Sequence, residues 1–274
     1  MWSLTVPVFR RAAVVGTTLG ACTFASSWTS QDGLEGATGV AGLWAVPRSI
    51  YTAWTFSTVV SDYKLTLHNV DKQAGEYAVV LSKLHDRNSQ RLLTLCRTNG
   101  GIFVKAGQIV AESSALPLEY REAFSALLDR AKASSYEEIE GVIAEALHGE
   151  DIKKHFSWIG PVAVASASLA QVHQARLLDG TLVAVKVQHA NLRTEVGADL
   201  TVMQCLAVCA PYVFEDLELG WLVKQLRLNL EHELDFINEG KNSEKLAASL
   251  QHRQDVVVPK VFWNLSSCRV LTTE

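Results

Sequence analysis

Leu182-Val183-Ala184-Val185-Lys186-Val187-Gln188 is a valine-rich run with one lysine inside it. Such a run is typical of a β-strand, whose alternate side chains point to opposite faces. The three valines therefore share one face, and Lys186 and Gln188 share the other. Burial of a lysine among apolar residues is unfavourable unless an anion lies beside it. The run leaves two interpretations open: a lysine that meets a phosphate and a carboxylate, or one that reaches solvent from an edge strand.

The residues before this run indicate a β-hairpin. Asp179-Gly180 separates two apolar runs, and an Asp-Gly pair suits the positive φ angles of a tight turn. Lys186 then lies on the second strand, and a segment of small residues, Ala165-Ser166-Ala167-Ser168, lies at the start of the first. In protein kinases a glycine-rich loop at this place covers the phosphates of ATP. The segment here has no glycine, so we expect a stiffer loop, with a plain surface turn as the alternative.

A short helix is predicted over residues 102–110, with Asn99 as a possible cap. Lys105 and Gln108 are three residues apart, so they share a face of this helix. Taken alone, these two residues are more typical of a solvated helix face than of a functional site.

One long helix is predicted over residues 221–250, because leucines recur at intervals of four. Asp235 and Glu239 are four residues apart and share one face of it. Glu233 lies about 200° from Asp235 around an ideal helix, so this geometry favours Asp235 over Glu233 at a common site. A solvated acidic face is the alternative for Glu233.

These motifs together resemble the UbiB-type atypical kinases, also called aarF-domain-containing kinases. The matching residues are A-S-A-S-L-A-Q-V-H from Ala165, D-G-T-L-V-A-V-K-V-Q-H from Asp179, K-A-G-Q from Lys105, and E-L-D from Glu233 with Glu239 after it. The resemblance covers roughly residues 95–274. It implies an α+β fold: a protein-kinase-like N-lobe, with an antiparallel sheet and a helix C, after a helical extension that carries K-x-G-Q.

The resemblance also implies a function. It assigns binding of ATP, with Mg²⁺, to Ala165, Ser166, Ala167, Ser168, Lys186 and Glu239. Glu239 stands at the spacing of the family's helix-C glutamate, so we expect it to pair with Lys186. The resemblance assigns a cover over the active site to Lys105, Gln108, Glu233 and Asp235, which favours a small-molecule or lipid acceptor over a protein. Two alternatives stay open: a non-catalytic nucleotide-binding or membrane-associated scaffold module, and a structural protein in which Lys186 is only a packed lysine.

The catalytic motifs of a kinase C-lobe are not found in this sequence. Neither H-x-D-x-x-x-x-N nor D-x-G occurs, and the last residues, 269–274, resemble the final strand of an N-lobe. We therefore expect the C-lobe to be absent from this chain, and no catalytic residue or metal ligand to lie in it. Phosphoryl transfer would then need the C-lobe or a protein partner.

Three regions are expected along the chain: a targeting sequence with a linker over residues 1–35, the helical extension over 36–155, and the N-lobe over 156–274. No acidic residue precedes Asp32, and arginine, serine and threonine are present, as in a mitochondrial presequence. A secretory signal is the alternative. The resemblance favours the mitochondrion, with its inner membrane or a lipid as a partner. Residues 40–60 are long enough to span a membrane, but Pro47 and Arg48 interrupt them. We therefore expect a helix that packs on the domain or on a membrane surface, with a membrane span as the alternative.

Other local signals predict further elements. Pro117 suits the start of a helix that runs to residue 131, and Ser135 with Glu138 forms a capping box for a helix through Leu147. A helix is expected near 193–210, and strands at 256–263 and 268–273. The net charge of −4 gives no electrostatic basis for nucleic acid as a partner. Five cysteines without a C-x-x-C pair favour a reducing compartment over a disulfide framework.

Overall fold

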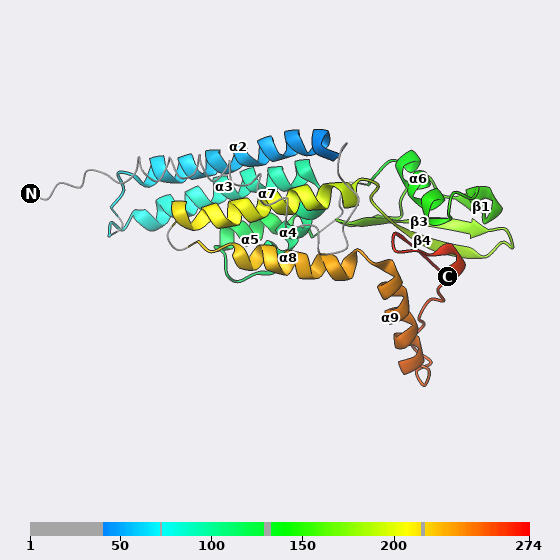
Figure 1. Ribbon diagram of the computed structural model, residues 1–274. Helices are drawn as coiled ribbons and strands as arrows, with labels where there is room; N and C mark the ends of the chain where they lie inside the picture. The colour runs from blue at the N-terminus through cyan, green and yellow to red at the C-terminus, as the bar shows by residue number, and fades with distance from the viewer. Residues whose placement is uncertain (1–40, 72, 129–132, 215–216) are drawn as a thin grey trace, which may run out of the picture.

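A bundle of long helices lies at one end of the molecule and a twisted sheet at the other (Figure 1). The computed structural model describes residues 41–71, 73–128, 133–214 and 217–274, so the predicted targeting segment 1–35 lies outside it. The bundle contains α2 (Ala41–Leu67), α3 (Tyr77–Asn99), α4 (Gly101–Glu112), α5 (Leu118–Ser125), α7 (Leu192–Val213) and α8 (Gly220–Glu233). Figure 1 shows α6 (Tyr136–Ala146) beside the sheet and α9 (Phe236–Ser249) projecting from the molecule.

The sheet is antiparallel throughout. Its strands are β1 (Phe156–Ile159), β2 (Ala165–Ser166), β3 (Ala170–Leu177), β4 (Leu182–Gln188) and β5 (Val270–Thr273). They follow the order β1-β3-β4-β5, and β2 pairs with β3. The β3–β4 hairpin turns at Asp179-Gly180, where Gly180 has a φ of 90°. The valines of β4 are buried, and Lys186 is partly exposed on the other face. The fold class is therefore as expected: a kinase N-lobe-like arrangement of sheet and helices.

Two large hydrophobic cores hold these parts together. The first lies within the bundle and includes Phe103 of α4, Val196 of α7 and Leu226 of α8. The second joins α6 to the sheet through Ile139, Ile143 and the β4 valines. The two cores therefore do not coincide with the expected helical extension, 36–155, and the expected N-lobe, 156–274. Helix α6 of the first range packs on the sheet, while α7 and α8 of the second range pack in the bundle.

The single long helix expected over residues 221–250 is wrong. The chain breaks at Leu234-Asp235 into α8 and α9, and α9 turns away from the direction of α8 (Figure 1). Asp235 has an extended backbone with φ −116° and ψ 96°, and its side chain accepts a hydrogen bond from Ile237 N, which caps α9. Leucine periodicity does not reveal this break, because both helices keep an apolar face on either side of it.

Several local predictions can be compared with the structure. The capping box at Ser135 and Glu138 is confirmed, and α6 begins at the next residue. Asn99 does not cap α4; it ends α3, and Gly100, with a φ of 67°, occupies the N-cap position. α5 ends at Ser125, before the expected position, and residues 129–132 lie outside the described part. Residues 256–263 form one isolated bridge, Val261 to Thr273, instead of a strand.

Residues 41–67 form α2, which packs on α3 and α7. Arg48 faces inward: its guanidinium pairs with Asp199 and donates a 2.6 Å hydrogen bond to Asn99 O. Within the described residues, no helix is both long and apolar enough to cross a bilayer.

Candidate functional site

Lys186 and Glu239 meet at the centre of the candidate site. Lys186 Nζ lies 2.6 Å from both carboxylate oxygens of Glu239, as the predicted pairing requires. It also lies 4.7 Å from the centre of the Phe236 ring, so Phe236 and Glu239 of α9 both contact the ammonium group. The lysine side chain is 33% exposed and that of Glu239 is 43% exposed, so solvent screens the pair and its contribution to stability is about 0–1 kcal/mol. The pair therefore positions an accessible cation more than it stabilises the fold.

The segment Ala165–Ser168 leads into the strand next to Lys186. Ala165 and Ser166 form β2, and a tight turn follows in which Ala167 N donates to Ala170 O at 2.8 Å. Ser166 Oγ is buried and has no hydrogen-bond partner among the described residues. Ser168 is buried, and its hydroxyl donates to Gln108 Oε1 at 3.4 Å. The segment is thus held from the bundle side by the K-x-G-Q helix.

The K-x-G-Q helix α4 contacts two parts of the candidate site. Lys105 Nζ lies 2.5 Å from Glu233 Oε1 at the end of α8, and Gln108 Nε2 donates to Leu127 O at 2.9 Å. Gly107 lies where a Cβ atom would approach Leu127 Cδ1 to 2.3 Å. The glycine is therefore needed for close packing of α4, while the lysine and glutamine make the polar contacts.

The preference for Asp235 over Glu233 is wrong for the contact with Lys105. Glu233 makes that contact, and the Asp235 side chain caps α9 instead. The reason is the helix break between these two residues, which removes the ideal 100° per residue on which the preference depended. Glu233 and Glu239 are consequently on different helices and reach different lysines.

Two polar residues near the segment were missed by the sequence reasoning. His189 Nε2 lies 3.0 Å from Ala167 O, and Ser134 Oγ lies 2.9 Å from His189 Nδ1. Because a carbonyl oxygen only accepts, Nε2 carries the hydrogen and the serine hydroxyl donates to Nδ1. In the sequence, the only indication of the contact between His189 and Ala167 was that His189 directly follows the lysine strand.

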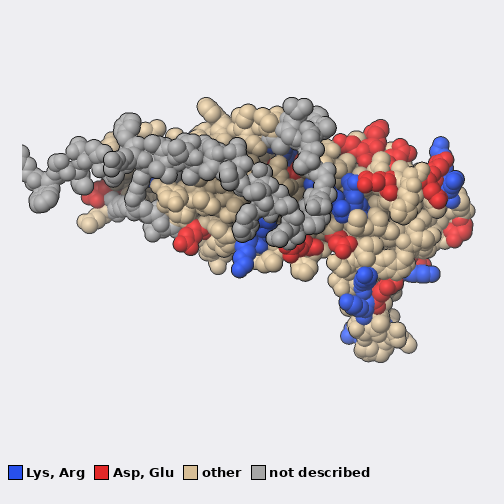
Figure 2. All heavy atoms as spheres, in the orientation of Figure 1, with Lys and Arg blue, Asp and Glu red and all other residues tan. Residues whose placement is uncertain are grey.

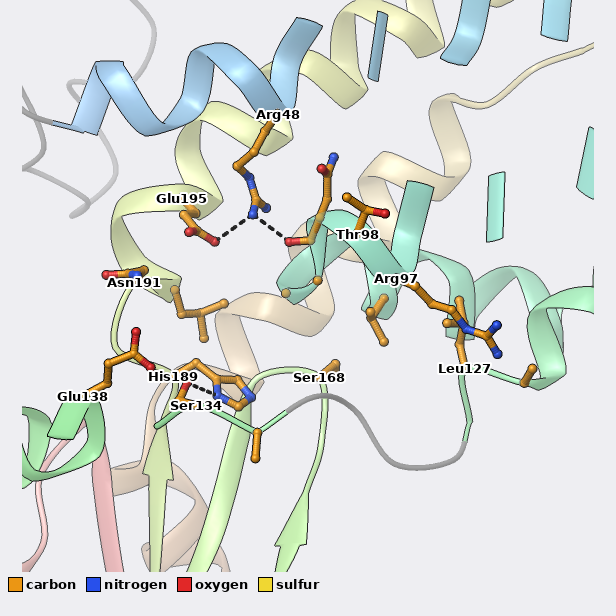
Figure 3. A pocket seen from close by; sticks show the side chains of 17 residues that line it. Arg48, Arg97, Thr98, Leu127, Ser134, Glu138, Ser168, His189, Asn191 and Glu195 are labelled. Carbon is orange, nitrogen blue, oxygen red and sulfur yellow. Dashed lines mark hydrogen bonds and ion pairs between the residues drawn. The ribbon is translucent and has the colours of Figure 1, made fainter. Parts of the chain in front are cut away.

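A pocket of about 630 Å³ separates the bundle from the sheet on this side. Figure 3 shows Ser168, Ser134 and His189 on its sheet side, with Arg48, Glu195 and Arg97 on its bundle side. Arg48 spans part of it, with Nη1 3.3 Å from Glu195 Oε2. Burial raises the pKa of both Glu195 and Asp199, although Arg48 acts in the opposite direction. In the part of the chain that the structure describes, no group of three or more His, Cys, Asp or Glu residues is arranged to hold a metal ion.

Comparison of the sequence with known proteins identifies the family of this chain. The antiparallel sheet, α9 and the lysine–glutamate pair are the parts of a kinase-like small lobe. Residues 126–274, more than half of the chain, match the model of the ABC1 atypical kinase-like domain. The chain belongs to this ABC1, or AarF, atypical kinase family.

The chain is similar to several curated members of the family. It is 40% identical to AarF domain-containing protein kinase 1 of Gallus gallus over 85% of this chain and 44% of that protein. It is 37% identical to AarF domain-containing kinase 1 of Drosophila melanogaster over 74% of this chain and 39% of that protein. The chain thus spans less than half the length of these relatives. A solved structure of Rv3197 with erythromycin, from Mycobacterium tuberculosis, matches 72% of this chain and 50% of that chain at 28% identity, with a TM-score of 0.43.

Proposed function

We propose that this chain binds ATP, with Mg²⁺, as the small lobe of a UbiB-type atypical kinase or ATPase. The observation that carries the proposal is the contact of Lys186 Nζ with both oxygens of Glu239. In protein kinases a strand lysine paired with a helix-C glutamate contacts the α- and β-phosphates. A fixed, one-third exposed ammonium group suits that task, because it offers positive charge without being buried alone.

The residues present fit a nucleotide in a second respect. The Ser166 hydroxyl is buried and has no partner within the described residues, which is unfavourable, and a ligand bound against this segment would supply one. Residues 165–168 would cover the phosphates and Lys186 would contact them. ATP would supply the phosphoryl group, and Mg²⁺ would neutralise its charge. Glu239 would keep the lysine aimed at the phosphates.

We further propose a small-molecule or lipid acceptor for the whole protein. The supporting observation is the position of α4, which Lys105 ties to Glu233 and Gln108 ties to Ser168. A helix held against the nucleotide segment leaves less room for a protein substrate. Phosphoryl transfer is likewise proposed for the whole protein and not for this chain alone, because the chain spans less than half the length of its relatives.

Thermal unfolding with and without Mg²⁺ and ATP tests the nucleotide site. A ligand at 100 times its Kd adds about 2.7 kcal/mol of stability, which is a readily measured shift in Tm. We expect the shift in the wild type and in the control Lys245→Met, whose lysine is exposed on α9, and its loss in Lys186→Met. A shift that survives in Lys186→Met would contradict the assigned site. No shift in the wild type would favour the scaffold alternative.

We also propose a mitochondrial location, with the inner membrane or a lipid as a partner. The support is the composition of residues 1–35, in which Arg10 and Arg11 precede an apolar run and no acidic residue comes before Asp32. A fluorescent fusion of the whole chain should reach mitochondria, and the variant Arg10→Glu with Arg11→Glu should not. On the face shown in Figure 2, acidic and basic side chains are interspersed over the sheet end of the molecule.

A further inference from the structure

Gln188 lies two residues after Lys186 on the same face of β4, and it is fully buried. Its side-chain Nε2 donates two hydrogen bonds, to Leu234 O at 2.7 Å and to Cys268 O at 3.1 Å. Leu234 is the last residue before the break between α8 and α9, and Cys268 precedes β5. One carboxamide therefore joins the lysine strand, the helix break and the chain that enters the neighbouring strand.

The Leu234 carbonyl explains why the contact matters. In a continuous helix this oxygen would accept from the backbone N–H four residues later, which belongs to Asn238. Here Asn238 N donates to Asp235 O at 3.1 Å, so the Leu234 carbonyl has lost its helical donor. Gln188 supplies the replacement. The carbonyl bonds to a side chain that is fully buried, where an acceptor without a donor is unfavourable, so Gln188 stabilises the break.

The break in turn determines which carboxylates reach the two lysines. On one unbroken helix the directions of the Glu233 and Glu239 side chains would be fixed relative to each other. Because the helix is broken, α8 places Glu233 at Lys105 and α9 places Glu239 at Lys186. Phe236 N also donates to Cys268 O at 3.2 Å, so the first turn of α9 is anchored at the same carbonyl as Gln188.

We propose that Gln188 is a positioning residue, which holds the α8–α9 break open and thereby aligns Glu239 with Lys186. Its side chain acts through the backbone carbonyls of Leu234 and Cys268, to which it donates. Its effect on nucleotide affinity rests on the proposed function; its effect on the break and on the ion pair does not.

The variant Gln188→Met tests the inference, because methionine has nearly the same length but no donor. Gln174→Met is the matched control, since Gln174 is exposed on the adjacent strand β3. Hydrogen exchange should become faster at the amides of residues 236–239 in Gln188→Met, while the β3–β4 hairpin stays protected. Unchanged exchange at these amides would overturn the proposal, and the control should match the wild type.

The chemical reactivity of Lys186 gives a readout that a general loss of packing does not predict. Acylation by acetic anhydride, followed by mass spectrometry, should be faster at Lys186 in Gln188→Met and unchanged at the exposed Lys245. The increase should be up to about fivefold, the factor equivalent to loss of an ion pair worth about 1 kcal/mol. Equal reactivity of Lys186 in both proteins would overturn the proposal.

Two further measurements separate this inference from the nucleotide proposal. If the wild type binds Mg²⁺ and ATP, Gln188→Met should bind about tenfold more weakly; if it does not bind, exchange and acylation still decide the role of Gln188. If Gln188→Met does not fold, hydrogen exchange of the Gln188 carboxamide can be measured by NMR in the wild type. Both carboxamide protons of Gln188 should exchange slowly, and fast exchange of either one would overturn the proposal.

Discussion

Lys105 Nζ and Glu233 Oε1 lie 2.5 Å apart and join the K-x-G-Q helix to the end of α8. The pair links two segments that are far apart in the sequence and close in the bundle. Glu233 is partly exposed, with 40% of its side chain accessible, so the pair fixes an orientation more than it adds stability.

A double-mutant cycle between Lys105→Met and Glu233→Gln should measure this pair directly. We expect a coupling free energy of about 0.2–1 kcal/mol in urea unfolding, the usual range for an accessible ion pair. The control cycle replaces Glu233→Gln with Asp235→Asn, which keeps a side chain able to cap α9. Coupling to Asp235 without coupling to Glu233 would restore the assignment favoured by ideal helix geometry.

The variant Gly107→Ala should destabilise the bundle. Its added Cβ would lie 2.3 Å from Leu127 Cδ1 and 3.0 Å from Phe124 Cδ1, and overpacking of this kind costs about 1–3 kcal/mol. The matched control is Gly141→Ala in α6, where nothing lies within 4 Å of the new atom. That substitution should leave stability equal or raise it by up to about 1 kcal/mol, because alanine favours a helix. Equal effects at the two positions in chemical denaturation would show that Gly107 is not required for packing.

Asp62 should make the bundle sensitive to acid. Hydrogen bonds from Arg87, Arg91 and Asn88 hold the pKa of Asp62 well below its ordinary value of 3.8. Because the folded-state pKa is depressed, the unfolded chain binds a proton first. The stabilisation is therefore present above about pH 4 and is lost as the pH falls further.

The variant Asp62→Asn should lose about 1.5–3 kcal/mol at pH 7, the usual contribution of hydrogen bonds to a charged group. Its unfolding free energy should also fall less steeply than that of the wild type below about pH 4. The control Asp71→Asn removes an exposed carboxylate that has no ion pair within the described ranges. Parallel pH curves for the wild type and Asp62→Asn would rule out this source of acid sensitivity.

The variant Arg48→Met should be among the most damaging single substitutions in the bundle. It leaves Asp199, whose side chain is 4% exposed, without its cation, and breaking such a pair costs about 3–5 kcal/mol. Burial raises the pKa of Asp199 and Arg48 lowers it, so without Arg48 the carboxyl takes up a proton more readily and the cost should shrink as the pH falls.

Urea unfolding of Arg48→Met, with Arg193→Met as the control on the exposed side of α7, measures this effect. The control should change stability by less than about 0.5 kcal/mol, as exposed substitutions usually do. A similarly small change in Arg48→Met would mean that the Asp199 carboxyl is satisfied without the arginine.

Structural features that depend only on residues close together in the sequence could be predicted. The Asp179-Gly180 turn, the alternation of β4 and the Ser135–Glu138 capping box all appear where expected, because each depends on residues within one turn or one strand. The pairing of Lys186 with Glu239 came from a resemblance between motifs. The role of Arg48 was not predictable, because an arginine between apolar residues does not reveal which carboxylate from another helix it will meet.

The sequence alone determined the strand that carries Lys186, the hairpin that contains it and the family to which the motifs belong. Only the tertiary structure decided that residues 221–250 form two helices and that Glu233, not Asp235, faces Lys105. The physical reason is that helix propensity favours continuation through Leu234, while the hydrogen bond from Gln188, 46 residues away in the chain, replaces the helical donor of Leu234 and permits the break. Local sequence specifies turns and periodicity, and a long-range hydrogen bond determines where the helix stops.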